Sequence, residues 1–191
     1  MLKNIFNHPR IFIVIIILVS LIILKAKIGK TYYEFYPGIP LYPNNKTEVE
    51  KVKKYIKLRT PEDVEFFYKT NKSVTNVFSE QVNETEEELN KILDSQNNII
   101  LFFKYLFNRA RPNQIDQEII PINTETAKTP AFPAGHAFQA YYLSQYLSKK
   151  YPEKQSIFKK IAKECDLTRI KAGLHYPSDG KLSEILVNTL F

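Results

Sequence analysis

Three short segments in the C-terminal half of the chain combine basic side chains and histidines at spacings suited to phosphate chemistry. Arginine and lysine bind phosphate oxygens, and imidazole transfers protons or attacks phosphorus near neutral pH. Phosphoryl transfer depends mainly on positioning and charge stabilisation, because negative charge spreads over the equatorial oxygens in the transition state. The segments are Lys104-x6-Arg111-Pro112, Pro133-Ala134-Gly135-His136 and Arg169-x5-His175-x3-Asp179.

The cationic residues of these segments are the candidate phosphate ligands. Lys104, Arg111 and Arg169 supply donors, and an arginine can contact two phosphate oxygens at once. Gly135 lets the backbone approach a ligand closely, and its place at the expected start of a helix offers free N–H groups to an anion. The sequence therefore predicts that these four residues bind the phosphate.

Two of the three histidines lie in these segments and can provide nucleophilic and acid–base catalysis. A neutral His175 can attack phosphorus if a carboxylate holds its other ring nitrogen, and Asp179 is the candidate carboxylate. Pro177 favours a turn into a helix, which would bring Asp179 back to His175. His136 can protonate the leaving oxygen and then activate the water that hydrolyses a phosphohistidine. We therefore predict that His175, His136 and Asp179 are the catalytic residues.

Taken together and in this order, the three segments resemble the signature of the type 2 phosphatidic acid phosphatase / vanadium haloperoxidase superfamily. The resemblance covers about residues 85–191 in layout. It implies a helical bundle and a site without a metal, in which the three cationic residues hold the phosphate. It also implies that His175 is the nucleophile, that Asp179 orients it, and that His136 is the acid/base.

The chain departs from the family pattern at three points, of which Thr168 in place of the usual serine before Arg169 is a conservative one. Ala134 stands where family members usually have a serine, which removes one donor and about 1–3 kcal/mol of transition-state stabilisation. The phosphatidate phosphatases proper cross the bilayer several times, whereas Glu87, Lys91 and Asp94 give the expected helix here a polar face. The resemblance is therefore closer to the acid-phosphatase and haloperoxidase branches of the family.

An apolar run near the N-terminus predicts a membrane anchor. Residues 11–24 contain Ser20 as their only polar residue, and residues 11–29 are long enough to span a bilayer if Lys25 and Lys27 reach the interface. The alternative is a cleaved signal peptide, but the flank lacks the small-x-small pattern of a signal peptidase site, so we expect an uncleaved, single-pass anchor. Basic residues flank the run on both sides and leave its orientation nearly undecided; we expect the catalytic domain on the non-cytoplasmic side. The predicted division is 1–30 anchor, 31–46 Pro-rich connector and 47–191 helical phosphatase domain.

The net charge of +7 follows mainly from this anchor. Residues 1–30 carry +5, which leaves +2 for the other 161 residues. Anionic lipid headgroups explain the basic flanks, so we expect no nucleic-acid partner. The expected partner is a phosphorylated small molecule or a lipid phosphate, and the sequence does not specify the oligomeric state. A single cysteine, Cys165, excludes an intramolecular disulfide and a Cys-based zinc site.

Periodicity and helix-start signals predict an all-α fold behind the anchor. Thr47 and Glu50 form a candidate capping box, Thr60 precedes a proline at a helix start, and Thr85 with Glu88 opens the longest periodic stretch. A Pro-rich loop is expected at 113–134. The remaining predicted helices span about 135–147, 153–172 and 177 to the end of the chain.

Three interpretations of the site remain open at the level of sequence. The favoured one is a metal-independent phosphatase without a cofactor, which vanadate would inhibit as a mimic of the transition state. In the second, vanadate is the prosthetic group of a haloperoxidase held by the same residues. In the third, suggested by Ala134, the protein is a catalytically weak module that binds phosphate or headgroups. Arg109 lies off the pattern and is expected to be a solvated surface residue.

Overall fold

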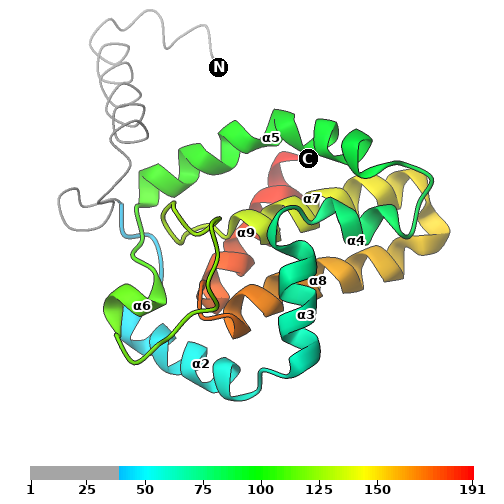
Figure 1. Ribbon diagram of the computed structural model, residues 1–191. Coiled ribbons are helices and arrows are strands. Elements are labelled where there is room, and N and C mark those ends of the chain that lie inside the picture. Colours follow the sequence, from blue (N-terminus) through cyan, green and yellow to red (C-terminus); the bar gives the residue numbers. More distant parts are fainter. Residues whose placement is uncertain (1–38) are drawn as a thin grey trace, which may run out of the picture.

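The computed structural model describes residues 39–191, and the regular structure in this range is entirely helical (Figure 1). This confirms the all-α prediction for the described part of the chain. The predicted anchor at 1–30, with its span at 11–29, lies outside the described residues. The elements are α2 (Asn45–Lys57), α3 (Pro61–Asn71), α4 (Thr75–Ser79), α5 (Glu86–Phe107), α6 (Pro112–Ile115), α7 (Gly135–Lys150), a 3-10 turn (Pro152–Lys154), α8 (Gln155–Lys171) and α9 (Pro177–Leu190).

Helix α7 is the central element and packs on α8, α9 and α5 (Figure 1). Small and apolar residues at helical spacing make this possible, since Ala137, Ala140, Leu143 and Leu147 are fully buried. Ala140, Leu143 and Leu147 join a core to which α4, α5 and α8 also contribute, including Phe158 of α8. Because the core holds α7 on three sides, the start of this helix has a fixed place in the fold.

Two predicted helix starts are confirmed. Thr60 and Asp63 form a reciprocal capping box at the start of α3, and Thr85 and Glu88 form another at α5. The apolar face predicted for the long helix is also buried at its start, where Leu89 has no exposed surface.

The start of α2 corrects a third prediction. The helix begins at Asn45, and the side chain of Asn44 accepts hydrogen bonds from the backbone N–H groups of Lys46 and Thr47. Asparagine caps helices at least as well as threonine, so the earlier cap is used and Thr47 becomes helical. The helical region therefore starts two residues before the predicted boundary at 47.

The region between α5 and α7 is more structured than predicted. Helix α5 ends at Phe107, where Asn108 takes up a left-handed conformation (φ 47°). One further helical turn, α6, follows within the expected loop, and the backbone N–H of Arg111 donates to the side chain of Gln114 at its start. Helix α4 was not predicted, and five residues are too few for a periodic signal.

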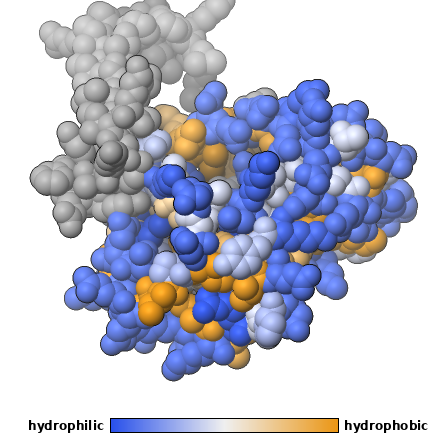
Figure 2. All heavy atoms as spheres, viewed as in Figure 1, coloured by the Kyte–Doolittle hydropathy of each residue, from blue (hydrophilic) through white to orange (hydrophobic). Residues whose placement is uncertain are grey.

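The surface of the described region is mostly hydrophilic. Figure 2 shows polar side chains over most of the visible face, with hydrophobic ones gathered in smaller patches. No helix within residues 39–191 combines the length and apolar composition that a membrane span requires. On α5, Glu87 and Lys91 form an exposed ion pair on the outer face, as the sequence pattern indicates.

Candidate active site

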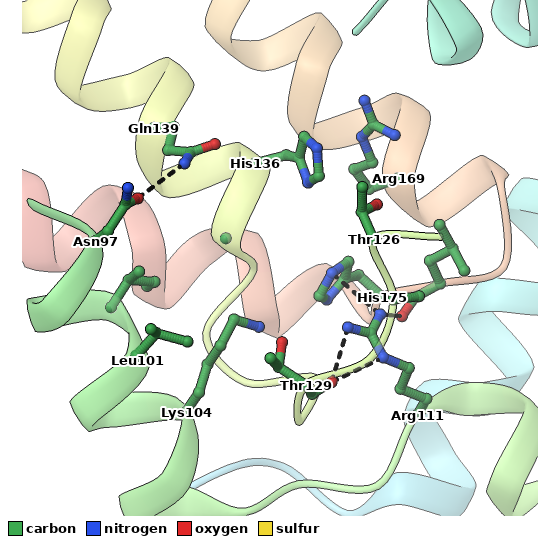
Figure 3. A pocket seen from close by; sticks show the side chains of 14 residues that line it. Asn97, Leu101, Lys104, Arg111, Thr126, Thr129, His136, Gln139, Arg169 and His175 are labelled. Carbon is green, nitrogen blue, oxygen red and sulfur yellow. Dashed lines mark hydrogen bonds between the residues drawn. The ribbon is translucent and has the colours of Figure 1, made fainter. Parts of the chain in front are cut away.

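A pocket of about 290 Å³ opens where α5, α7, the end of α8 and the 113–134 loop meet (Figure 3). These segments are far apart in the sequence, and packing around α7 brings them together. Asp179 does not line the pocket but lies behind His175. The predicted site residues that line the pocket are Lys104, Arg111, Gly135, His136, Arg169 and His175.

His175 and Asp179 form a buried pair at the start of α9. The Nδ1 of His175 lies 3.0 Å from Oδ2 of Asp179, and the backbone N–H of Tyr176 donates to the same oxygen at 2.9 Å. Pro177 begins the helix, so the carboxylate sits in its first turn next to the residues that precede it. Because Nδ1–H donates to Asp179, the Nε2 of a neutral His175 carries the lone pair.

The electrostatics of the pocket favour that neutral form. Burial lowers the pKa of His175 to about 3, and the charge of Arg111 acts in the same direction, while the bond to Asp179 opposes them. At neutral pH the imidazole is therefore unprotonated. A neutral imidazole with a fixed tautomer is the form that can act as a nucleophile.

Arg111 is held beside this nucleophile by backbone carbonyls. Its Nε and Nη2 donate to the carbonyl of Thr129 at 3.0 and 2.9 Å, and its Nη1 donates to the carbonyl of Leu174 at 2.9 Å. The same Nη1 lies 3.4 Å from Nε2 of His175. The guanidinium thus lies where an anion bound at His175 would meet it.

Lys104 lies near the first turn of α7. Its ammonium donates to the carbonyl of Pro130 at 2.7 Å, and burial, followed by the charge of Arg111, lowers the pKa of Lys104 well below its usual range. A Cβ at Gly135 would lie 3.5 Å from Cε of Lys104, so the glycine backbone and the lysine are neighbours. The N-cap residue Ala134 makes no side-chain hydrogen bond to α7, which leaves the helix start open to an anion.

His136 and Arg169 lie together at the other end of the pocket (Figure 3). The Nε2 of His136 donates to the backbone carbonyl of Asn71 at 3.0 Å, so its Nδ1 carries the lone pair in the neutral form. Burial, followed by the charge of Arg169, lowers the pKa of His136 to about 3. This histidine is therefore also neutral at neutral pH, and an anion placed beside it would raise its pKa.

Arg169 is buried without a full set of partners. Its Nη2 donates to the hydroxyl of Thr70 at 2.6 Å, and its guanidinium carbon lies 4.5 Å from the centre of the Phe67 ring. Its Nε and Nη1 have no hydrogen-bond partner within the described part of the chain. An unsatisfied buried donor is costly, so these two groups indicate a place for an anionic ligand.

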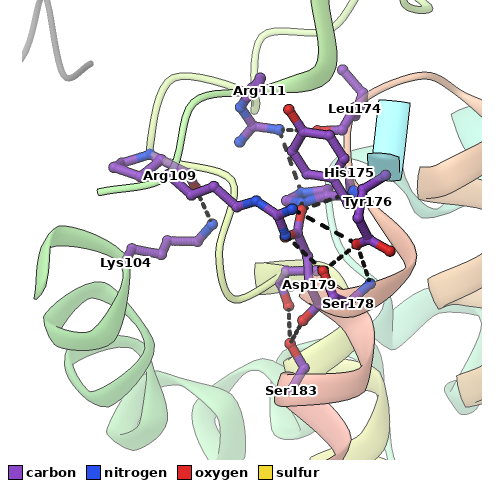
Figure 4. A network of polar contacts seen from close by, with 12 residues as sticks. Lys104, Arg109, Arg111, Leu174, His175, Tyr176, Ser178, Asp179 and Ser183 are labelled. Carbon is purple, nitrogen blue, oxygen red and sulfur yellow. Dashed lines mark hydrogen bonds and ion pairs between the residues drawn. The ribbon is translucent and has the colours of Figure 1, made fainter. Parts of the chain in front are cut away.

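The position of Arg109 differs from the one expected from the sequence. It was expected at the surface, yet its side chain is fully buried and its Nη1 lies 2.7 Å from Oδ1 of Asp179 (Figure 4). The physical reason is that a carboxylate buried in the core needs a cation. His175 is neutral and cannot supply that charge. The need for a cation beside the predicted Asp179 was the one signal in the sequence that could have indicated this arginine.

The pocket as a whole is a positively charged cavity. Among the described residues, its lining includes Lys104, Arg111 and Arg169 but no aspartate or glutamate. Within residues 39–191 no three His, Cys, Asp or Glu side chains lie close enough together to hold a metal ion. The arrangement provides a nucleophile, a second imidazole and three cations for an oxyanion.

Two comparisons found known proteins or families to which this chain is similar. A family model described as the PAP2 superfamily matches residues 92–186, which include all three motif segments. The chain is also similar to a solved structure, the first transmembrane PAP2 type phosphatidylglycerolphosphate phosphatase from Bacillus subtilis. The similarity has a TM-score of 0.48 and 15% sequence identity, and covers 92% of this chain and 94% of that one. No curated protein matches the chain in sequence.

Proposed function

The chain belongs to the PAP2 superfamily, and on that basis we propose that it is a phosphatase that hydrolyses phosphate monoesters through a phosphohistidine at His175. One observation carries the proposal. The Nδ1 of His175 donates to Asp179, while its Nε2 lies 3.4 Å from Nη1 of Arg111, in a pocket whose lining within residues 39–191 holds three cationic side chains and no carboxylate. This geometry suits attack on a bound phosphate.

In the first step, the phosphate of the substrate binds among Lys104, Arg111 and Arg169 at the start of α7. The Nε2 lone pair of His175 attacks phosphorus, and the bond between phosphorus and the leaving oxygen breaks. The leaving oxygen takes up a proton from His136 and departs as an alcohol. Asp179 stabilises the imidazolium character that develops on His175.

In the second step, His136 accepts a proton from a water molecule, whose oxygen attacks phosphorus. The bond between Nε2 of His175 and phosphorus breaks, inorganic phosphate leaves, and His175 returns to its neutral form. His136 regains the proton it gave up in the first step, so the cycle balances. The residues of this chain fill each role of the cycle without a metal ion.

The proton that His136 donates has to enter with the substrate or from solvent. Both histidines are neutral in the empty pocket, because burial and the neighbouring arginines lower their pKa values to about 3. A phosphate monoester has a second pKa of about 6 and still carries a proton below it. The productive complex therefore forms best from acid to neutral pH, and the rate falls at alkaline pH.

The proposed substrate is a phosphorylated small molecule or a lipid phosphate, and the proposed setting is a membrane. The apolar run at residues 11–29 supports a single-pass anchor. The side of the membrane that we propose for the catalytic domain is the non-cytoplasmic one. Such an anchor would hold the pocket near lipid substrates and would also permit soluble ones. The substrate panel below separates the two classes.

A phosphate-release assay of the full chain in detergent micelles tests this proposal. The panel contains phosphatidate, a lipid diphosphate, an aryl phosphate and a sugar phosphate, each with and without a chelator. We expect turnover on at least one monoester, unaffected by the chelator, and its loss in His175→Ala. Wild-type turnover in His175→Ala would refute the assignment of the nucleophile, and activity that requires an added metal would refute the metal-independent mechanism.

A further inference from the structure

Arg109 does not line the pocket, and it bonds to the oxygen of Asp179 that His175 does not contact (Figure 4). We propose that Arg109, held in place by α2, is a positioning residue that fixes the carboxylate of Asp179 and through it the imidazole of His175. This inference rests on the proposed function, because it assigns a role in the reaction at His175. It also gives a role to the first helix after the predicted connector.

The two oxygens of Asp179 have separate partners. Oδ1 accepts from Nη1 of Arg109 at 2.7 Å, and Oδ2 accepts from Nδ1 of His175 at 3.0 Å and from the backbone N–H of Tyr176 at 2.9 Å. A carboxylate held at one oxygen only could rotate about its last bond. The bond to Arg109 opposes that rotation and keeps Oδ2 directed at His175.

Arg109 is itself fixed on every side. Its Nε donates to Oδ1 of Asn45 at 2.9 Å, its Nη2 donates to the carbonyl of Pro43 at 3.2 Å, and its Nη1 also donates to the hydroxyl of Ser178 at 2.7 Å. The flat face of the guanidinium lies 3.8 Å from the centre of the Tyr176 ring. Only a planar group with several donors can satisfy this arrangement, so a lysine cannot replace it fully.

Glu48 links this arginine to the start of α9. The Glu48 side chain is buried, and its Oε2 accepts from both the backbone N–H and the hydroxyl of Ser178. The same oxygen lies 3.7 Å from Nη2 of Arg109. Helix α2 thus contacts the cation and the helix turn that carry Asp179, although no residue of α2 lines the pocket.

The charge of Arg109 gives this role a measurable signature. Burial acts to raise the pKa of Asp179, but the bond from His175 and the charge of Arg109 reverse this and hold the pKa below its usual value. Loss of that positive charge would also favour protonation of His175. The acid limb of the pH–rate profile would then move to higher pH, whereas loss of packing alone would leave its position unchanged.

The experiment compares variants of the full chain in detergent micelles with an aryl phosphate that the wild type hydrolyses. Arg109→Met removes the charge, Arg109→Lys keeps the charge but not the geometry, and Glu48→Gln removes the α2 carboxylate. The matched controls are Arg59→Met, whose arginine contacts the backbone of Lys171 away from the pocket, and Glu50→Gln on the exposed face of α2.

We expect kcat to fall about 10- to 100-fold in all three test variants, with KM within about twofold of the wild type, as is usual for residues that orient a reacting group. The acid limb should move to higher pH in Arg109→Met and stay in place in Arg109→Lys. Wild-type kcat in Arg109→Lys and Glu48→Gln would overturn the proposal, as would an unmoved acid limb in a folded Arg109→Met. If Arg109→Met does not fold, the other two variants decide.

A second readout does not depend on turnover. In ¹⁵N-labelled protein, the Nδ1–H of His175 should give a downfield proton resonance, assigned by its loss in His175→Ala. We expect this resonance to disappear or broaden in Arg109→Lys and Glu48→Gln and to persist in both controls. Persistence in the test variants overturns the positioning role. A wild type that shows the resonance and its dependence on Arg109, but hydrolyses no ester, would refute the proposed function and leave the positioning role standing.

Discussion

Of two fully buried arginines at the site, Arg109 and Arg169, substitution by methionine should destabilise the protein strongly at the first and hardly at all at the second. Arg109 has a partner on each nitrogen, including the carboxylate of Asp179 at 2.7 Å. Arg169 has one hydrogen bond, to Thr70, and two donor nitrogens without a partner in the described residues. We therefore consider Arg109→Met and Arg169→Met as a pair.

The expected magnitudes follow from these contacts. Removal of Arg109 leaves Asp179 buried without its cation, which costs about 3–5 kcal/mol of folding free energy. Removal of Arg169 relieves two unsatisfied donors, worth about 1–3 kcal/mol each. It also loses one charged hydrogen bond of about 1.5–3 kcal/mol and a cation–π contact with Phe67 of about 1–2 kcal/mol. The two sides nearly cancel, so Arg169→Met should leave stability close to that of the wild type.

Urea unfolding of the full chain in micelles, followed by helical circular dichroism, measures both changes. A second titration includes inorganic phosphate, which at 100 times its Kd should stabilise the wild type by about 2.7 kcal/mol. Arg169→Met should lose most of this gain, because it lacks the donors that phosphate would satisfy. The assignment of Arg169 as a phosphate ligand would be refuted if Arg169→Met were as unstable as Arg109→Met and phosphate still stabilised it as much as it stabilises the wild type.

Three further predictions concern the rest of the site. Ala134→Ser would supply an N-cap to α7 and a hydroxyl donor at the pocket. We expect the free energy of unfolding in urea to rise by about 1 kcal/mol and kcat/KM to rise about 10-fold. No gain in either quantity would contradict this prediction. The kcat/KM of a monoester should fall above about pH 6 and hold down to the region of the His175 pKa of about 3, and a profile rising into the alkaline range would contradict this. Sulfate, whose own charge stays constant, should bind with proton uptake and lose affinity as pH rises, because a bound anion raises the lowered pKa of His136. Calorimetry in buffers of different ionisation enthalpy measures the uptake, and release of protons would refute it.

Local features of this fold could be predicted from the sequence. The capping boxes at Thr60 and Thr85 each join residues that are three positions apart, and His175 contacts a residue four positions away, Asp179. The order of the three motif segments also indicated which side chains come together at the pocket. That meeting depends on the family resemblance, because spacing alone does not place α5 beside α7.

The contacts that sequence reasoning missed join residues far apart in the chain. Arg109 reaches Asp179 across 70 positions, and Glu48 reaches Ser178 across 130. Before the fold is known, each looks like an ordinary surface charge, because most arginines and glutamates are exposed. The start of α2 was misplaced for a different reason, since Asn44 and Thr47 are both good caps and the helix uses the earlier one.

The most direct test of the phosphohistidine mechanism is to trap the covalent intermediate. His136→Ala should slow the step in which water cleaves the phosphohistidine, so ³²P-labelled substrate mixed with this variant and quenched in alkali should leave label on the protein. We expect the label to be stable to alkali, labile to acid and located by mass spectrometry on His175. Label on any other residue, or turnover by His175→Ala at the wild-type rate, would contradict it.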